Sequence, residues 1–359
     1  MIIGKVAFFY SKRTPKFISY LFFLIMNKIK VIGIIGGGKM GSDIFNYLSD
    51  FNFELIWFTR NTDHKEVIKN TYRKKIKRQL KHGIISQDIF TLKENYQITT
   101  DLKDLSNCDL IIESVIEERD IKIELFQKLD SIVKPSCVLA SNSSSILPSG
   151  LSEKVERKNR VLGLHFFYPI AFKNVVEIVS SDFTDELSIE KMRLFLNDIK
   201  RFYLIQNKND AFILNRFLLQ IQIRAFEIVK EKGISFKQLD SISKQIIPEF
   251  GLFEVMDSVG HNTMYNAIHN YSKMDEDKRK YRPLLEELKK RSSKSGQVEH
   301  LLFYENDSRE GIISNNLSIE IRGNILSIIE DYLNEYSEKY SINIFNLKKG
   351  LEEYCGLNL

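Results

Sequence analysis

The chain is poor in the residues that mark several classes of protein. It contains only three cysteines, Cys108, Cys137 and Cys355, and no two of them have CxxC spacing. Scattered thiols of this kind argue against a disulfide framework and against a zinc site, and they favour a reducing, cytoplasmic setting. No other cluster of His, Cys, Asp and Glu has the spacing of metal ligands, so we expect no metal.

An excess of charge of one sign is also missing. The formal net charge is +5 over 359 residues, and basic and acidic residues are mixed along most of the chain. Such mixing is typical of solvated helix faces and predicts no nucleic-acid partner. One basic run, RKKIKRQLK at 73–81, stands out. It is either a solvated helix face or a surface that meets the phosphates of a ligand.

Long apolar runs are absent, with one short exception at residues 17–26, FISYLFFLIM. This run is too short to span a bilayer, and no small-residue cleavage site follows it. A core strand is predicted immediately afterwards, so we interpret residues 1–27 as an extension outside the fold and expect no membrane association. A membrane anchor is the alternative. The rest of the chain, 43% hydrophobic and 28% charged, has the composition of a globular protein long enough for two domains.

A glycine pattern follows the first predicted strand. Residues 30–35, KVIGII, form a short run that is apolar after its first residue, and helical periodicity begins near Asp43. A GxGxxG pattern between a strand and a helix is the fingerprint of a dinucleotide-binding turn, with the helix N-terminus facing the pyrophosphate. Further apolar runs at 53–58, 109–112 and 137–140 continue the βαβ order, so we predict a Rossmann fold. The predicted cofactor-binding turn consists of Gly36, Gly37, Gly38, Lys39, Met40 and Gly41.

The second predicted strand ends without an acidic residue. Where an Asp or Glu would accept the ribose hydroxyls of NAD, this chain has Thr59 followed by Arg60. An arginine at this position can hold a 2′-phosphate in a bidentate manner. The residues therefore predict an NAD(P) cofactor with NADP(H) slightly favoured. The alternative is that Arg60 stacks on adenine and that either cofactor is used.

A histidine and a glutamate lie in consecutive apolar runs. His165 lies near the end of the apolar run at 162–167, Glu177 lies within 175–179, and a serine cluster, SNSSS, precedes them at 141–145. An imidazole titrates near neutral pH, so it can both remove and return a proton. A carboxylate bound to its second nitrogen would fix the tautomer. A lone histidine on a strand is more often a core residue, but here several motifs coincide.

These motifs together resemble the 3-hydroxyacyl-CoA dehydrogenase family over roughly residues 28–300. The resemblance is carried by GGGKMG, IIESVIEERDIKIELF, LASNSSS, RVLGLHFFYP, VVEIV and AFILNRFLLQ. It implies an oxidoreductase that interconverts 3-hydroxyacyl-CoA and 3-ketoacyl-CoA by hydride transfer with NAD(P). His165 would be the general base and acid, oriented by Glu177. Ser144 and Asn215 would hydrogen-bond the reacting oxygen and the thioester region, with Ser143 and Ser145 as close rivals of Ser144.

The resemblance also implies cofactor contacts outside the glycine turn. Glu117, Lys122 and Ser144 match family positions, and Lys294 resembles the lysine of a C-terminal segment. Tyr168 stands where the family usually has an asparagine that touches the nicotinamide. Asp210-Ala211 likewise replaces a usual Pro-Gly. These departures lie around the cofactor and substrate and suggest altered specificity, because they leave the His and Glu in place.

The predicted domain order is an α/β Rossmann domain followed by an all-α C-terminal domain. We place the NAD(P)-binding Rossmann domain at 28–209 and the all-α dehydrogenase domain at 210–300, which by resemblance closes the cleft and forms a homodimer. Gly233 and Gly251 are predicted to end helices, and a linker is predicted around 297–315. Residues 316–359 are read as a partial helical repeat without a matching catalytic group, or as a plain helical extension.

Two other functions remain open. The same chemistry could act on an acyl group carried by an acyl-carrier protein in a biosynthetic pathway, which a free basic surface at 73–81 would favour. A non-catalytic nucleotide-binding relative is the second alternative. The intact set of Ser144, His165, Glu177 and Asn215 argues against it, and Tyr168 is its only support.

Overall fold

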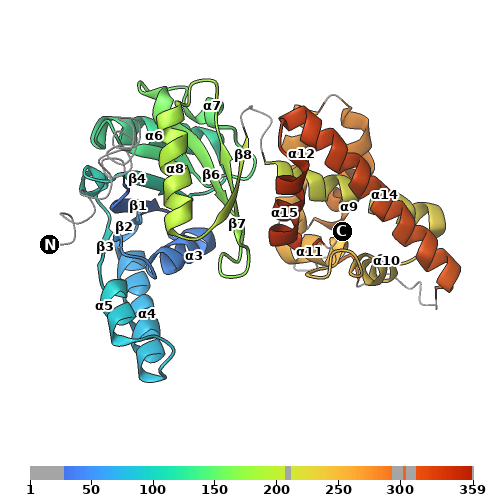
Figure 1. Cartoon of the computed structure of the whole chain (residues 1–359), viewed down its shortest axis with the longest axis horizontal. Helices are drawn as coiled ribbons and strands as arrows, with labels where there is room; N and C mark the ends of the chain where they lie inside the picture. Colours follow the sequence, from blue (N-terminus) through green and yellow to red (C-terminus); the bar gives the residue numbers. More distant parts are fainter. Residues whose placement is uncertain (1–27, 207–211, 276, 293–301, 305–312, 358–359) are drawn as a thin grey trace, which may run out of the picture.

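The protein is described here from a computed structural model, which covers residues 28–206, 212–275, 277–292, 302–304 and 313–357. Figure 1 shows two bodies, a sheet covered by helices and a helical body formed by the second half of the chain. The extension at 1–27, Asp210-Ala211, Lys294 and most of the predicted linker lie outside the described residues.

The first body is built on an eight-stranded sheet in the order β3-β2-β1-β4-β5-β6-β7-β8. All neighbouring strands are parallel except β6 and β7, which pair antiparallel. The chain winds outward from β1 in both directions, so the loop after β1 lies at the switch point where such sheets bind ligands. The strands are β1 (Val31–Ile35), β2 (Glu54–Phe58), β3 (Tyr96–Thr99), β4 (Leu110–Glu113), β5 (Val138–Ser141), β6 (Val161–Phe166), β7 (Val175–Val179) and β8 (Phe202–Gln206).

Both faces of this sheet are buried, which explains the continuous apolar runs of its strands. Ile34 joins the apolar cluster under α3, α4 and α8, whereas its neighbour Ile35 joins the cluster under α6 and α7. The four strands predicted from apolar runs are all present, and the predicted Rossmann fold is confirmed. The covering helices are α3 (Lys39–Leu48), α4 (Thr62–Lys81), α5 (Gln87–Lys93), α6 (Arg119–Ile132), α7 (Pro148–Leu151) and α8 (Glu186–Asp198), with short 3₁₀ turns η1 (Leu102–Leu105) and η2 (Lys158–Arg160).

The second body is all helical, as predicted. Its central helix α9 (Ile213–Lys232) is buried along most of its length and ends at Gly233, which has a φ of 64°. The prediction for Gly251 was wrong: this residue begins α11 with an extended backbone instead of ending a helix. The remaining helices are α10 (Phe236–Ser243), α11 (Leu252–Val259), α12 (His261–Met274), η3 (Lys278–Tyr281), α13 (Arg282–Arg291), α14 (Asn315–Tyr340) and α15 (Ile344–Cys355).

The last helix returns to the first body. Helix α14 packs against α9 and α10, and α15 packs against α9, the edge strand β8 and its neighbour β7. In Figure 1 α15 lies on the side of the helical body that faces the sheet. Ser341 turns the chain between α14 and α15 with a φ of 53°, much as Gly233 does between α9 and α10. The shared turn supports a helical repeat, which stays a prediction.

Within the described ranges, no helix has both the length and the apolar composition needed to cross a membrane.

Candidate active site

A large cavity lies between the sheet and the helical body. Its volume is about 1660 Å³, which exceeds the roughly 300–1,000 Å³ typical of a site for one small molecule. Its walls come from the glycine turn, the ends of β2, β4, β5 and β6, and helices α9, α11, α12 and α15. There is therefore room for a dinucleotide and a second ligand together.

The glycine turn is shaped by close backbone contacts. Gly36 has a φ of +128°, and a Cβ there would overlap the carbonyl group of Ser114. A Cβ on Gly41 would overlap the carbonyl oxygen of Gly36, so helix α3 can approach the turn only through a glycine. Gly38, in contrast, faces open space. The turn thus presents bare backbone to the cavity.

This turn fits a pyrophosphate. Helix α3 begins after Gly38 with no side chain capping its first turn, and its amides can therefore receive an anion. Gly36, Gly37, Gly38, Lys39 and Met40 all line the cavity. Gly41 does not, since it is buried in the packing contact.

The residues that follow β2 also lie at this end of the cavity. Thr59 is buried, and Arg60 is exposed and lines the cavity. No ion pair joins Arg60 to another residue of the described ranges. Its guanidinium can therefore meet a ligand from solvent.

His165 and Glu177 form a buried pair. Because β6 and β7 are antiparallel, the two residues lie directly opposite each other in the sheet. His165 Nδ1 is 2.8 Å from Glu177 Oε2, and the side chains are 6% and 0% exposed. His165 lines the cavity, whereas Glu177 lies behind it. The ring of Phe167 packs against the imidazole with the centroids 4.3 Å apart.

Two further donors hold the Glu177 carboxylate. Its Oε1 accepts hydrogen bonds from Gln206 Nε2 at 2.8 Å and from the backbone N–H of Leu214 at 2.9 Å. A carboxylate is an acceptor only, so its remaining oxygen requires a proton on His165 Nδ1. This network assigns the tautomer of the neutral imidazole: the proton is on Nδ1, and Nε2 is left as the acceptor. Sequence reasoning missed Gln206, although a lone amide in the apolar strand FYLIQ was a signal.

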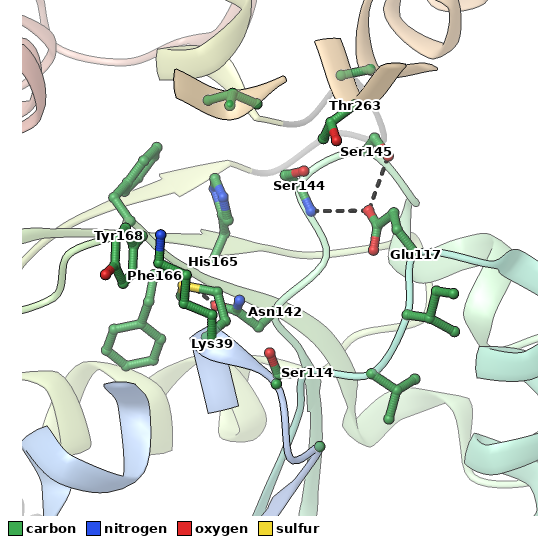
Figure 2. Close-up of a pocket in the computed structure, with 18 of the residues that line it drawn as sticks. Lys39, Ser114, Glu117, Asn142, Ser144, Ser145, His165, Phe166, Tyr168 and Thr263 are labelled. Atoms are coloured by element: carbon green, nitrogen blue, oxygen red, sulfur yellow. Dashed lines mark hydrogen bonds between the residues drawn. The ribbon is translucent and has the colours of Figure 1, made fainter. Parts of the chain in front are cut away.

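The serine cluster forms a loop held by Glu117. Glu117 Oε1 accepts hydrogen bonds from the hydroxyls of Ser143 and Ser145 and from the backbone N–H of Ser144. Figure 2 shows Glu117 directed at this loop, with Ser144 and His165 facing the same space. The Ser144 hydroxyl has no hydrogen-bond partner in the part of the chain that the structure describes. Of the three serines, Ser144 is thus the one available to a ligand.

Lys122 lies beneath the loop and is 1% exposed. Its ammonium group is 2.7 Å from Glu113 and 3.2 Å from Glu117. Removing one partner of a buried ion pair leaves an uncompensated charge and typically costs about 3–5 kcal/mol. Lys122 therefore supports the serine loop, and its predicted contact with a cofactor stays a prediction, as does that of Glu117.

The acid sensitivity of this loop follows from Glu117. Loss of hydration alone would raise the pKa of its carboxyl, but Lys122 and the hydroxyls of Ser143 and Ser145 outweigh it and hold the pKa below 4.5. As the pH falls, the Glu117 carboxyl therefore takes up a proton in the unfolded chain before it does so in the folded protein. The stabilisation is complete above pH 4.5 and is lost as the pH falls through the pKa of Glu117 in the folded protein. Glu117→Gln should flatten the decline of the melting temperature below pH 4.5. Glu118→Gln, at an exposed neighbour, should leave the decline as in the wild type; equal curves for both variants would contradict the prediction.

Tyr168 borders the cavity on the other side. It is 46% exposed, and Lys39 Nζ lies 4.0 Å from the centroid of its ring. Figure 2 shows both side chains on the side of His165 away from Glu117. The ammonium group of Lys39 therefore packs over the ring of Tyr168 at the cavity wall, beside the glycine turn.

Asn215 is in the cavity with two tyrosines that sequence reasoning missed. Tyr354 of α15 donates a hydrogen bond from its hydroxyl to Asn215 Oδ1 at 2.8 Å. Tyr271 of α12 donates to the backbone carbonyl of Ser144 at 2.6 Å. Burial raises the pKa of the Tyr271 phenol, while a hydrogen bond with Asn215 opposes the increase. The segment at 316–359, which was read as having no matching catalytic group, thus supplies Tyr354 to the cavity wall.

The structure brings together most of the predicted site residues, including Ser144, His165 and Asn215 around one space. Lys294 lies outside the described residues. Across the described ranges, no three His, Cys, Asp or Glu side chains are placed to hold a metal ion.

Both bodies match models of known protein domains. Residues 31–208 match the model of the 3-hydroxyacyl-CoA dehydrogenase NAD binding domain, and residues 212–305 match that of the C-terminal domain of the same enzymes. The chain is 26% identical to 3-hydroxybutyryl-CoA dehydrogenase of Bradyrhizobium diazoefficiens over 71% of this chain and 87% of the relative. It is 27% identical to the mitochondrial hydroxyacyl-coenzyme A dehydrogenase of Sus scrofa, over 71% and 84%.

A solved structure is similar over both bodies. The crystal structure of FadB2 of Mycobacterium tuberculosis superposes with a TM-score of 0.67 at 27% identity, covering 73% of this chain and 94% of the other. The two domain matches end at residue 305. Helices α14 and α15 therefore lie beyond them.

Proposed function

This chain belongs to the 3-hydroxyacyl-CoA dehydrogenase family, and we propose that it interconverts 3-hydroxyacyl-CoA and 3-ketoacyl-CoA thioesters with His165 as general base and acid. The observation that carries this proposal is the buried pair of His165 and Glu177 at the wall of a cavity that also holds the glycine turn. The relatives named above are 3-hydroxybutyryl-CoA and hydroxyacyl-coenzyme A dehydrogenases, which supports the substrate class.

His165 would move the proton of the substrate hydroxyl. With Nδ1 protonated and bound to Glu177, Nε2 is free to accept that proton during oxidation and to return it during reduction. The buried carboxylate stabilises the imidazolium formed by protonation, and its bonds to Gln206 and Leu214 keep it in place. The nicotinamide cofactor would supply the hydride acceptor or donor.

Ser144 and Asn215 would orient the substrate. The Ser144 hydroxyl is available to a ligand. The backbone of Ser144 is held by two hydrogen bonds, one from its N–H to Glu117 and one from the Tyr271 hydroxyl to its carbonyl. Hydrogen bonds to the reacting oxygen and to the thioester region would fix the substrate carbon for hydride transfer, which is a positioning effect.

The cofactor is a nicotinamide dinucleotide bound at the glycine turn, and we propose that NADP(H) is preferred. The support for this preference is Arg60, exposed at the end of the cavity where the adenine ribose of a Rossmann cofactor lies, together with the absence of a carboxylate at Thr59. A guanidinium group binds a phosphate better than it binds a ribose hydroxyl.

Arg60→Ala tests this preference. We expect the dissociation constant of NADPH to increase about tenfold or more, because charge-assisted bonds to the phosphate contribute about 1.5–3 kcal/mol. The dissociation constant of NADH should change less than twofold. Fluorescence titration of both cofactors measures this, with Arg78→Ala on the exposed face of α4 as the control. An equal loss for both cofactors would assign Arg60 to adenine stacking.

A carrier-protein substrate is the second candidate, and one observation favours it. The basic residues of α4 at 73–81 are largely exposed, and α4 projects from the sheet in Figure 1. The same charges can also meet the phosphates of CoA. The cavity, which has room for a second ligand beside the dinucleotide, leads us to propose CoA first.

The decisive experiment follows the absorbance at 340 nm with acetoacetyl-CoA and either NADH or NADPH. Consumption of cofactor supports the dehydrogenase, and the faster cofactor decides the preference. Consumption only with an acetoacetyl-carrier protein would transfer the proposal to that substrate. Cofactor binding without turnover on either thioester would leave a non-catalytic nucleotide-binding protein.

The proposal also covers the cellular compartment and the oligomeric state of the protein. Its three cysteines are free and buried, in keeping with a reducing cytoplasm. A homodimer through the helical body is proposed from the family resemblance, and light scattering of the purified chain tests it.

A further inference from the structure

The C-terminal helix α15 reaches the site with one polar side chain. Its buried face, formed by Leu347, Leu351 and Cys355, packs into the core of the helical body. Gly350 lets the helix approach β8, because a Cβ there would lie only 2.7 Å from Leu204 Cδ1. This docking places Tyr354 at the cavity wall. The position of Tyr354 is therefore set by packing along the whole helix.

The hydrogen-bond roles around Asn215 can be worked out from the partners. Tyr271 commits its single proton to the Ser144 carbonyl, which can only accept. In its bond with Asn215, the Tyr271 oxygen must therefore accept from the amide N–H. The Asn215 Oδ1 is then directed to Tyr354, whose hydroxyl donates to it at 2.8 Å. Both ends of the amide are held.

The second N–H of the Asn215 amide has no further partner in the described part of the chain. Because both ends of the amide are fixed, the direction of this N–H is fixed as well. The ring of Tyr354 also packs against Phe167 in a tilted arrangement, with centroids 4.5 Å apart, and Phe167 packs on His165. Tyr354 thus contacts Asn215, the proposed thioester-binding residue, and also Phe167, which packs on the proposed proton-transfer residue His165.

We propose that Tyr354 is a positioning residue, through which the C-terminal helix α15 orients the Asn215 amide and, by way of Tyr271, the Ser144 loop toward a 3-ketoacyl or 3-hydroxyacyl thioester. This inference rests on the proposed function for the identity of the ligand. Helix α15 lies beyond the residues matched by the two family domains. In this proposal the C-terminal segment at 316–359 therefore contributes a positioning residue to the site.

A double-mutant cycle tests the proposal on the full chain. Tyr354→Phe keeps the ring and removes only the hydroxyl, and we expect kcat/KM for acetoacetyl-CoA to fall about tenfold, the effect of one hydrogen bond. The KM of the reduced cofactor and the melting temperature should stay unchanged. Tyr332→Phe removes a phenol hydroxyl from α14, outside the cavity lining, and should behave as the wild type.

The coupling with Asn215 separates positioning from a merely structural role. Asn215→Ala alone should reduce kcat/KM about a hundredfold, and adding Tyr354→Phe to it should cause little further loss, because residues that act through one another are not additive. Additive losses, or a Tyr354→Phe variant as active as the wild type, would overturn the proposal.

Failure of the proposed function is recognised separately in the same proteins. If the wild type does not consume cofactor with acetoacetyl-CoA, the reaction is refuted, and the cycle is measured as the dissociation constant of acetoacetyl-CoA in the presence of oxidised cofactor. Non-additive loss of binding then retains the positioning role, and additive loss removes it. A wild type that neither reacts with nor binds the thioester overturns both.

Discussion

Replacing His165 with alanine should lower kcat by about 10²–10⁴-fold, the usual contribution of a positioned acid–base group. The variant removes Nε2, which faces the cavity as the free acceptor of the imidazole. The dissociation constant of the dinucleotide should remain within about twofold, because the glycine turn is separate from β6 in the sequence and binds through backbone groups. Steady-state rates with acetoacetyl-CoA and fluorescence titration of the cofactor measure the two effects.

A matched histidine on the surface controls for this substitution. His269 lies on α12, is exposed and does not line the cavity, so His269→Ala should retain wild-type turnover. A His165→Ala variant that loses cofactor binding to the same extent as turnover would show that the histidine has a different role.

Replacing Glu177 with glutamine should lower kcat by a similar factor, on the order of 10³-fold, although the two side chains are nearly identical in shape. The amide oxygen can still accept from Gln206 and Leu214, which directs the amide N–H₂ toward His165. An N–H facing Nδ1 forces the proton onto Nε2, and His165 then presents a donor where the reaction needs an acceptor. The variant should also lose the stabilisation of the imidazolium.

Folding and cofactor affinity should survive this change, because the new side chain fills the same space. Melting temperature and cofactor titration check both, and Glu186→Gln on the exposed first turn of α8 serves as the control for the substitution itself. A Glu177→Gln variant that retains wild-type kcat would mean that the carboxylate sets neither the tautomer nor the charge of His165.

The strand, glycine turn and helix of the predicted dinucleotide-binding motif could be predicted because the pattern that specifies them is local in the sequence. The apolar run before Gly36, the glycine spacing and the helix that follows are adjacent in sequence, and the structure confirms the strand, turn and helix that they predict. The choice of Ser144 over its neighbours was not local. Ser144 stays a prediction, and its support comes from Glu117, which accepts from the hydroxyls of Ser143 and Ser145 and leaves the Ser144 hydroxyl available.

The residues that support the site were harder to find. Gln206, Tyr271 and Tyr354 carry no motif, and each acts on a residue that lies between 29 and 139 positions away along the chain. A polar residue within an apolar segment was the only available signal, and it applied to Gln206 alone. Tyr354 could not be distinguished from other tyrosines of the amphipathic extension, because nothing in a helical pattern says which distant surface the helix will meet.

The sequence by itself therefore determined the fold class and the strand, glycine turn and helix of the nucleotide-binding motif, and it singled out His165 and Glu177 as the proposed proton-transfer pair, because these depend on short-range patterns and on the types of residue that the chemistry requires. Only the tertiary structure decided which serine hydroxyl is left without a partner in the described part of the chain, how Glu177 is held and that the C-terminal helix brings Tyr354 to the cavity wall. These features arise from contacts between segments far apart in the chain. Their geometry is set by the antiparallel pairing of β6 with β7 and by the docking of α15 on the sheet edge, where backbone register and close packing bring the side chains into hydrogen-bond distance.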